Sequence, residues 1–382
     1  MNAPARRAIV FIFVVLHPTL AWAEAKVNNE SAQAQSIDLS VPESPAFTAL
    51  GLSPQSVTRP ASTQELAATV LNGVDKNGNF QSGLALDVAP YQLLFGDTVS
   101  LKQYQQGADS PSLTRILWRS QTSAATAKGT NDADKSVRLA LGIRVTPWDR
   151  GDPRLDGELE ACLRKVARSI VQTPLLPESE GKDEAERSEF RRRINEAQQK
   201  LRTESQTCRD EAQKRLWNNS SWALGAAPSW ISTDGSVDRM NWDGGILWTS
   251  IAYGFEDVPG LQDAAQLILH GRYRGNEQVP DPKNKGKFFE QNSVAGGARL
   301  RFGNDKFAVS IEALRIFEDP VHRRSSESTR ASIGVDIRLS KELWLEVSVG
   351  GEGGRRDGNN QAFVLGSFKW GTTKEPKLTI TK

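Results

Sequence analysis

The chain has 382 residues, of which 25% are charged and 38% hydrophobic, and this mixture excludes a disulfide-rich mini-protein, a collagen-like repeat and a chain disordered throughout. Lys and Arg total 48 and Asp and Glu total 46, so loss of the two Arg near the N-terminus leaves no net charge, which argues against a nucleic-acid partner. The chain has only two Cys and three His, which are too few ligands to favour a zinc or haem site.

Residues 1–23 have the pattern of a secretory signal peptide. Arg6 and Arg7 form a basic start, residues 8–16 are apolar, and the segment closes on an Ala-Trp-Ala triplet ending at Ala23. A membrane anchor is the alternative, but so short an apolar run does not span a hydrocarbon core of about 30 Å. We expect cleavage after this triplet. We find no other apolar stretch long enough for a transmembrane helix, so contact with a membrane would require a barrel.

Residues 24–82 are predicted to form an N-terminal lead-in. Several Pro in its first half forbid a long regular element. Ser62 and Glu65 then stand in capping-box spacing, and Gly73 ends the apolar stripe that follows, which predicts one short helix. This lead-in either supplies an additional strand or serves as a plug inside the barrel proposed below.

After Gly83 the sequence alternates between apolar and polar residues. Between Val137 and Val145, for example, every second residue is apolar, which is typical of a strand with one apolar face. The pattern predicts about eleven strands, near residues 84–95, 113–124, 136–147, 219–231, 244–255, 262–274, 288–302, 306–317, 328–339, 342–351 and 361–370.

Strand length and aromatic placement favour a membrane barrel over a soluble β-sandwich. Most predicted strands run 10–14 residues, whereas soluble strands cluster near five or six and barrel strands need about 9–11. Aromatic residues fall mostly near the predicted strand ends, where a girdle would meet lipid headgroups. They are Trp118, Trp148, Trp222, Trp230, Trp242, Trp248, Trp370, Tyr91, Tyr253 and Tyr273.

With its signal segment, plug-like lead-in, long amphipathic strands and aromatic strand ends, the chain resembles bacterial outer-membrane β-barrel proteins as a broad class. The resemblance covers residues 83–371, apart from a helical insert, and no single family's motif is matched. It implies an all-β fold, an antiparallel transmembrane β-barrel of about 12 strands (10–12), followed by a polar tail at 372–382. It also implies a porin-like or structural protein in the outer membrane of a Gram-negative envelope, in contact with outer-membrane lipid. The alternative is a secreted or periplasmic β-sandwich that acts as a binding module.

Residues 152–217 break the alternation and predict a helical hairpin inserted in the barrel. Its apolar stripes are Leu155, Leu159, Cys162, Val166 and Ile170 on the first helix and Phe190, Ile194, Ala197, Leu201, Cys208 and Ala212 on the second. In an antiparallel pair with Leu155 level with Leu216, Cys162 faces Cys208. Because the signal segment implies an oxidising compartment, we predict a Cys162–Cys208 disulfide, with two buried thiols as the alternative.

Connection lengths predict the side on which this hairpin lies. The tight turns at 303–306 and 340–341 are typical of the periplasmic side of a barrel, and strand parity puts the hairpin and the C-terminus on that same side. A second helix from about 182 to 216 would reach about 50 Å. We therefore consider a periplasmic or cell-wall partner for the hairpin, while the oligomeric state is left open.

The predicted inner face carries most of the charge of the strands. Its candidate lumen-lining residues are Arg138, Arg144, His270, Arg272, Arg299, Arg301, Glu312, Arg330, Asp336, Arg338 and Glu346. Because Arg outnumbers the acids, an open lumen would favour anions, whereas a closed ladder of Arg–acid pairs would make a non-conducting barrel. We find no hydrolase or protease signature, so no catalytic, cofactor-binding or metal site is expected, and a barrel enzyme acting on lipid ranks third.

Overall fold

The computed structural model describes residues 45–50, 85–95, 98–106, 112–128, 136–171, 184–233, 236–256, 258–261, 264–281, 284, 286–340, 343–354 and 360–370. The expected signal segment at 1–23, the short helix between Ser62 and Gly73 and the polar tail at 372–382 lie outside the described residues.

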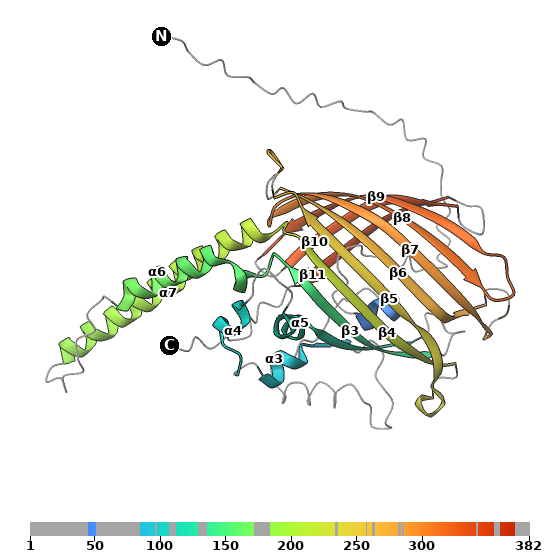
Figure 1. Ribbon diagram of the computed structural model, residues 1–382, viewed down its shortest axis with the longest axis horizontal. Coiled ribbons are helices and arrows are strands. Elements are labelled where there is room, and N and C mark those ends of the chain that lie inside the picture. Colours follow the sequence, from blue (N-terminus) through green and yellow to red (C-terminus); the bar gives the residue numbers. More distant parts are fainter. Residues whose placement is uncertain are drawn as a thin grey trace, which may run out of the picture. The chain divides into compact units, whose positions relative to one another are not determined.

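A single antiparallel sheet of 11 strands pairs strictly in chain order (Figure 1). Its strands are β1 (Ala85–Val88), β2 (Gln121–Lys128), β3 (Val137–Asp149), β4 (Ser221–Ser232), β5 (Asn241–Gly254), β6 (Ala265–Pro280), β7 (Phe288–Gly303), β8 (Phe307–Pro320), β9 (Ser326–Arg338), β10 (Leu343–Gly353) and β11 (Gln361–Trp370). The all-β class is confirmed, and β3 to β11 lie within a few residues of their predicted positions. Among the described residues β1 and β11 do not pair with each other, so a closed, twelve-stranded barrel is not part of the observed sheet.

The first two predicted strands are largely wrong. The prediction at 84–95 holds only for the short β1, because helix α3 (Pro90–Phe95) begins at a proline, which suits a first helical turn and cannot donate to a strand ladder. The prediction at 113–124 begins instead with helix α5 (Leu113–Arg119), which follows Ser112 as its N-cap residue. A third helix, α4 (Leu101–Gln105), starts with a capping box at Ser100.

The two faces of the sheet differ in chemistry. The strand register places large apolar side chains on one face, the outer face, where many are exposed to solvent. They are Leu141, Ile143, Trp148, Trp222, Leu224, Trp242, Leu247, Ile251, Tyr253, Leu269, Tyr273, Val294, Phe302, Phe307, Ile311, Phe317, Ile333, Ile337, Val349 and Val364. The opposite, inner face carries mostly small and charged side chains, with a few buried apolar ones such as Ile246, Trp248 and Leu314. The sheet is therefore inverted relative to a soluble sheet with an apolar core.

The sheet is strongly curved about its inner face. Flat strands lie about 4.8 Å apart, so strands separated by two others would be about 14 Å apart. Yet Arg138 of β3 comes within 3.9 Å of Glu277 of β6, and Arg299 of β7 comes within 3.2 Å of Glu346 of β10. Curvature is therefore needed, in addition to long side chains, to bring these charges together.

A short helix, α1 (Pro45–Leu50), lies on the alanine-rich part of the inner face (Figure 1). It is held at both ends: the Ala46 amide donates to Ser123 Oγ at 3.0 Å, and Arg274 Nη2 donates to the Ala49 carbonyl at 2.8 Å. Trp248 contributes to the same cluster and lies over Gly225, whose missing side chain leaves room for the indole ring. The buried alanines of this seat are Ala125, Ala127, Ala140, Ala223 and Ala227.

The helical hairpin is inserted between β3 and β4, as the sequence predicts. A turn of 3-10 helix, η1 (Pro153–Leu155), leads into α6 (Gly157–Val171), and α7 (Glu184–Leu216) returns to β4. A second such turn, η2 (Val237–Arg239), precedes β5. Within the described part of the chain, no helix combines the length and the apolar character needed to cross a lipid bilayer.

Candidate functional site

The inner face brings the sequence-predicted charged residues onto one surface. Residues directly opposite each other on paired strands share a face, and the register pairs Arg299 with Glu312 and Asp336 with Glu346. His270 and Arg272 share the inner side of β6 with Gln266 and Arg274. The whole predicted set lies on this face: Arg138, Arg144, His270, Arg272, Arg299, Arg301, Glu312, Arg330, Asp336, Arg338 and Glu346.

A pair of β-bulges adds two acids that strict alternation assigns to the wrong face. Gly244 (φ 77°) and Asn276 (φ 57°) adopt left-handed backbone on adjacent strands, and the β6–β7 register shifts between Arg274 and Glu277. The shift turns Glu277 inward, where its Oε1 lies 2.5 Å from Arg274 Nη1. Asp243, beside Gly244, is also buried and accepts the Gln278 amide at 2.8 Å.

We call Arg138, Asp243, Arg272, Arg274 and Glu277 the bulge cluster. Arg138 lies 3.7 Å from Asp243 and 3.9 Å from Glu277 and also donates to the Gln278 carbonyl. Two acids therefore serve three Arg, and Arg272 is the member that forms no ion pair among the described residues.

A second charge cluster joins β7 to β9 and β10. Arg299 Nη2 lies 3.2 Å from Glu346 and 3.5 Å from Asp336, and Arg301 Nη2 lies 3.1 Å from the same Asp336. Further along the same two strands β9 and β10, Arg330 pairs with Glu352 at 3.0 Å. Most of the Arg that would have made an open lumen anion-selective are thus neutralised by inner-face acids.

The chain between α7 and β4 lies across one end of the curved sheet. Trp217 stacks on Trp344 of β10 with ring centroids 4.9 Å apart, and the guanidinium of Arg301 lies 5.0 Å from the Trp217 centroid. Asn218 Nδ2 donates to the Gly303 carbonyl at 2.8 Å. These contacts link β4, β7 and β10 at the hairpin end of the inner face, and we call this segment the floor.

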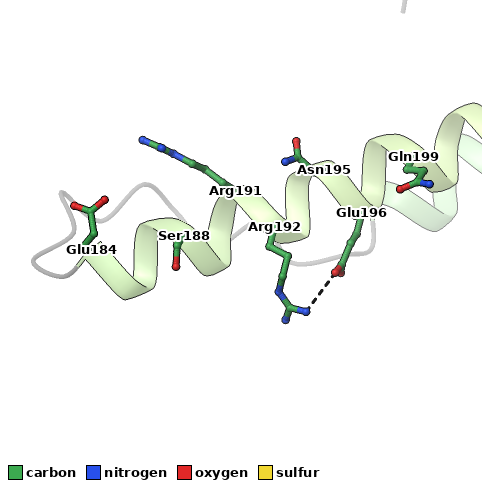
Figure 2. Close-up of a pocket in the computed structure, with 7 residues that line it drawn as sticks. All are labelled: Glu184, Ser188, Arg191, Arg192, Asn195, Glu196 and Gln199. Carbon is green, nitrogen blue, oxygen red and sulfur yellow. Dashed lines mark hydrogen bonds and ion pairs between the residues drawn. The ribbon is translucent and has the colours of Figure 1, made fainter.

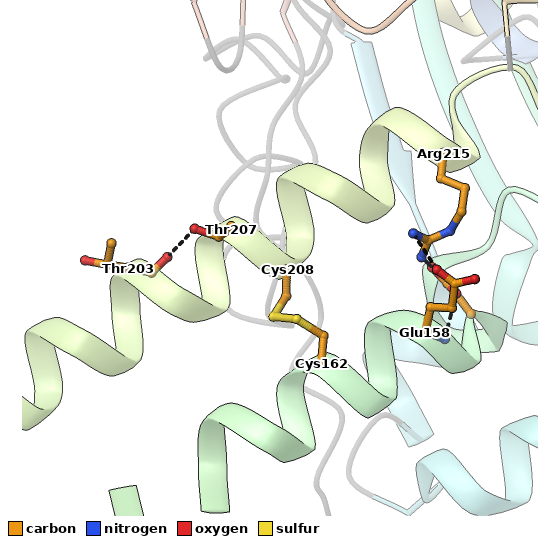
Figure 3. Close-up of a disulfide and its surroundings, with 7 residues drawn as sticks. Glu158, Cys162, Thr203, Thr207, Cys208 and Arg215 are labelled. Carbon is orange, nitrogen blue, oxygen red and sulfur yellow. Dashed lines mark hydrogen bonds and ion pairs between the residues drawn. A yellow bond between two sulfur atoms is a disulfide. The ribbon is translucent and has the colours of Figure 1, made fainter. Parts of the chain in front are cut away.

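The hairpin is closed by the predicted disulfide. Cys162 of α6 and Cys208 of α7 are bonded, with Cα atoms 5.9 Å apart (Figure 3). Near the base of the hairpin, Arg215 pairs with Glu158 at 2.9 Å and with Asp156 at 2.5 Å. The helices are therefore fixed in one register, and we call α6 and α7 together the arm.

Replacing Cys162 and Cys208 together by Ser should loosen the arm while leaving the sheet folded. A disulfide that closes a loop of this length stabilises the folded state by about 2–4 kcal/mol. Here that stabilisation acts on the pairing of the two helices. We expect faster proteolysis of α6 and α7 in the double variant, as in the reduced wild type. Reductant should have no further effect on the double variant, and equal cleavage of oxidised wild type and variant would contradict this prediction.

Beyond the end of α6, α7 is held by its own charges. The helix has 33 residues against 15 in α6, so its N-terminal half extends past its partner. Arg192 pairs with Glu189 at 2.8 Å and with Glu196 at 3.3 Å, pairings that suit a helix in water. Figure 2 shows the second of these pairs. Figure 2 shows polar side chains from Glu184 to Gln199 along the outer half of the arm.

A buried polar junction, which sequence reasoning missed, fixes the base of the arm. The carboxylate of Asp152, between β3 and η1, accepts a hydrogen bond from the Tyr104 hydroxyl of α4. Arg119 of α5 donates to its Oδ2 from Nε and Nη2 at 3.0 and 2.9 Å. The amide and Nε of Arg154 donate to its Oδ1 at 3.0 and 2.8 Å. Tyr104 and Trp118 are fully buried, and Tyr91 and Leu155 pack against them, so α3, α4, α5 and η1 meet in one packed unit at the base of the arm.

Electrostatics in this junction define the charge states that it needs. Burial alone would raise the pKa of Asp152, but the charge of Arg154 and hydrogen bonds from Arg154 and Tyr104 outweigh burial and hold the pKa below its usual value. Burial, with the nearby Asp152, raises the pKa of Tyr104 to about 12. The junction therefore combines an ionised Asp152 with a neutral Tyr104.

These pKa shifts predict that the junction is most stable over a middle range of pH and loses stability at both acid and alkaline pH. Asp152 has a depressed folded pKa, so its contribution is complete above its unfolded pKa of about 4 and is lost as pH falls further. Tyr104 has a raised folded pKa, so its contribution is complete below about pH 10 and is lost as pH rises toward its folded value of about 12. The thermal midpoint of unfolding, measured across pH, should fall both below about pH 4 and above about pH 10. In an Asp152→Asn variant the loss of stability at acid pH should be smaller, and a loss of unchanged size there would refute the assignment.

Several aromatic predictions also need correction. Trp118 is buried in α5, Tyr91 lies in α3 and Trp248 is 3% exposed on the inner face, so none of these three belongs to an outer girdle. Trp248 stacks instead against His270, with ring centroids 6.3 Å apart. Trp148, Trp222, Trp242 and Tyr253 are exposed on the outer face near strand ends, as predicted. Tyr273 is exposed on the same face but lies in the middle of β6.

Comparison with models of known protein families finds no match, and a search of curated protein sequences finds none either.

Proposed function

We propose that the chain is an outer-membrane β-barrel that serves as a pore or envelope structural protein, exported through the signal segment at 1–23. The observation that carries this proposal is the inverted sheet, which exposes large apolar side chains from β3 to β11 and turns its charges inward. In water such a face would be a severe liability, whereas in lipid it is the stable arrangement.

The height of the apolar face supports a bilayer. On β5 the exposed aromatics Trp242 and Tyr253 lie about 36 Å apart along an extended strand. At the tilt of about 45° usual for membrane strands, that length covers an apolar band of about 25 Å. Trp148 and Trp222 lie at the Tyr253 end, which fits an interfacial girdle on each side.

The proposal includes closure of the sheet into a barrel, because lipid offers no hydrogen-bond partner to the backbone groups at an open strand edge. The two edges to be joined are those of β1 and β11, either directly or through one more strand from the lead-in, which would give twelve. One sheet of 11 strands paired in chain order also favours a barrel over the alternative binding module built as a two-sheet sandwich.

Contacts on the inner face favour the plugged, structural form of this barrel. Helix α1 lies over β2 to β5, the two charge clusters cross-link β3 to β10, and the floor lies across the hairpin end. The arm leaves the sheet at the end that has the tight β7–β8 turn, which in outer-membrane barrels faces the periplasm. In that setting the arm would reach a periplasmic or cell-wall partner.

Extraction followed by planar-bilayer recording tests the proposal. The processed protein should require detergent, show heat-modifiable mobility on gels and insert into a bilayer with little steady conductance. Discrete steps of conductance would instead favour the open pore. Release into the soluble fraction after mild lysis would overturn the barrel altogether.

A further inference from the structure

The acids of the bulge cluster are already engaged. Glu277 Oε1 lies 2.5 Å from Arg274 and 3.9 Å from Arg138, and Asp243 faces Arg138 at 3.7 Å. Arg274 further donates to the Ala49 carbonyl of α1. Both Arg138 and the Nη atoms of Arg274 are therefore engaged by the acids and the helix end. The third guanidinium of the cluster would have to compete for Glu277, which both already use.

That third guanidinium, Arg272, has no acceptor in the described part of the chain. Its Nε is buried without a hydrogen bond, and no ion pair within 4 Å involves this side chain. Its cross-strand neighbours are Trp248 and Ala295, both buried and neither able to accept from it through a side chain. The charged groups that act on Arg272 are Arg274, Glu277 and Arg330, so cations outnumber acids around it.

Arg272 is half-buried, and its Nε is shut off from water on a face where cations are in excess, which is costly unless an anion supplies the acceptor. Its planar fork of N–H donors matches the paired oxygens of a carboxylate or phosphate, which chloride lacks. We infer that Arg272 is the centre of an oxyanion-binding site on the inner face, bounded by Trp248, Arg274 and Arg330. The inference deepens the proposed function and rests on it, because the site belongs to the inner face of the proposed barrel.

The assignment differs from what the Arg excess in the sequence suggests. Arg299 and Arg301 form the densest Arg pair of the pattern, yet both are matched by Asp336, and Arg299 also by Glu346. Arg338 is similarly matched by Asp305 at 3.0 Å. The excess positive charge is thus concentrated at Arg272.

Inorganic phosphate, titrated by calorimetry into the purified full chain at constant ionic strength set with chloride, tests the site. Wild type should bind phosphate at one saturable site. Arg272→Gln should weaken binding about ten- to a hundredfold, the loss expected for charge-assisted hydrogen bonds, and Arg272→Lys should fall between. Arg338→Gln is the matched control, because it removes a paired charge from the same face, and it should bind as wild type does.

Two results would overturn the site: no saturable binding by wild type, or wild-type affinity in Arg272→Gln. If that variant does not fold, Arg272→Lys decides, since unchanged affinity there would exclude the forked geometry. Failure of the barrel proposal is distinguishable. A chain that stays soluble without detergent would contradict the barrel proposal. The phosphate titration would still measure binding at Arg272 in buffer.

Discussion

Asp152→Asn is expected to cost about 3–5 kcal/mol of the stability of the junction, the largest loss we predict outside the sheet. The substitution keeps the shape of the side chain but removes the charge that holds Arg119 and Arg154, and breaking a buried pair on one side leaves the cations without a counter-charge. The Asp152 side chain is 1% exposed and that of Arg119 is 7% exposed, so water cannot take over.

The loss should be measured by urea unfolding of the purified protein, followed by far-UV circular dichroism, with proteolysis at the base of the arm as a second readout. Glu256→Gln is the matched control. It breaks the Arg150–Glu256 pair at the same end of the sheet, but Arg150 is 57% exposed, so a change of at most about 1 kcal/mol is expected. Equal effects of the two substitutions would show that the junction is no more than a surface contact.

The alternation of apolar and polar residues predicts the strands well because the sheet has one face for each chemistry. From β3 to β11 the period of two persists, so position follows from sequence. It fails where the backbone leaves that period. The bulges at Gly244 and Asn276 reverse the face of Glu277, and no sequence pattern marks a bulge with certainty.

Helical register predicts the disulfide from sequence because the hairpin is a local structure with fixed ends. The junction could not be predicted in this way. Tyr104, Arg119 and Asp152 stand far apart in sequence and belong to segments between strands, and the sequence interpretation at 113–124 replaced the helix that carries Arg119 with a strand. Only the fold brings these side chains together, since none of them belongs to a short motif.

The sequence likewise predicts the charge imbalance of the inner face but not the residue at which the unmatched charge lies. Counting residues gives an excess of Arg, but the sum does not say which Arg lacks a partner. The pairing depends on the curvature of the sheet, which brings charges of β7 close to those of β10 and charges of β3 close to those of β6. It also depends on the bulge that turns Glu277 onto the inner face. The site at Arg272 is a consequence of geometry and not of composition.

Ile333→Arg should test the proposed lipid contact most directly, with an expected loss of about 2–4 kcal/mol if the site lies near the bilayer midplane. Ile333 is 59% exposed on β9, and its cross-strand neighbours Ile311 and Val349 are exposed beside it. A surface position in water would tolerate Arg within about 0.5 kcal/mol. The same residue change therefore has a large cost in lipid and almost none in solution.

Urea unfolding from lipid vesicles measures this difference. Leu113→Arg is the matched control, because Leu113 is 71% exposed at the start of α5, outside the apolar face, and the same change there should be nearly neutral. A large loss at Ile333 with little change at Leu113 is the result that the barrel requires, since only a hydrocarbon environment penalises one exposed apolar position and not the other. Two small losses would mean that the exposed face of the sheet does not contact lipid, whatever else covers it.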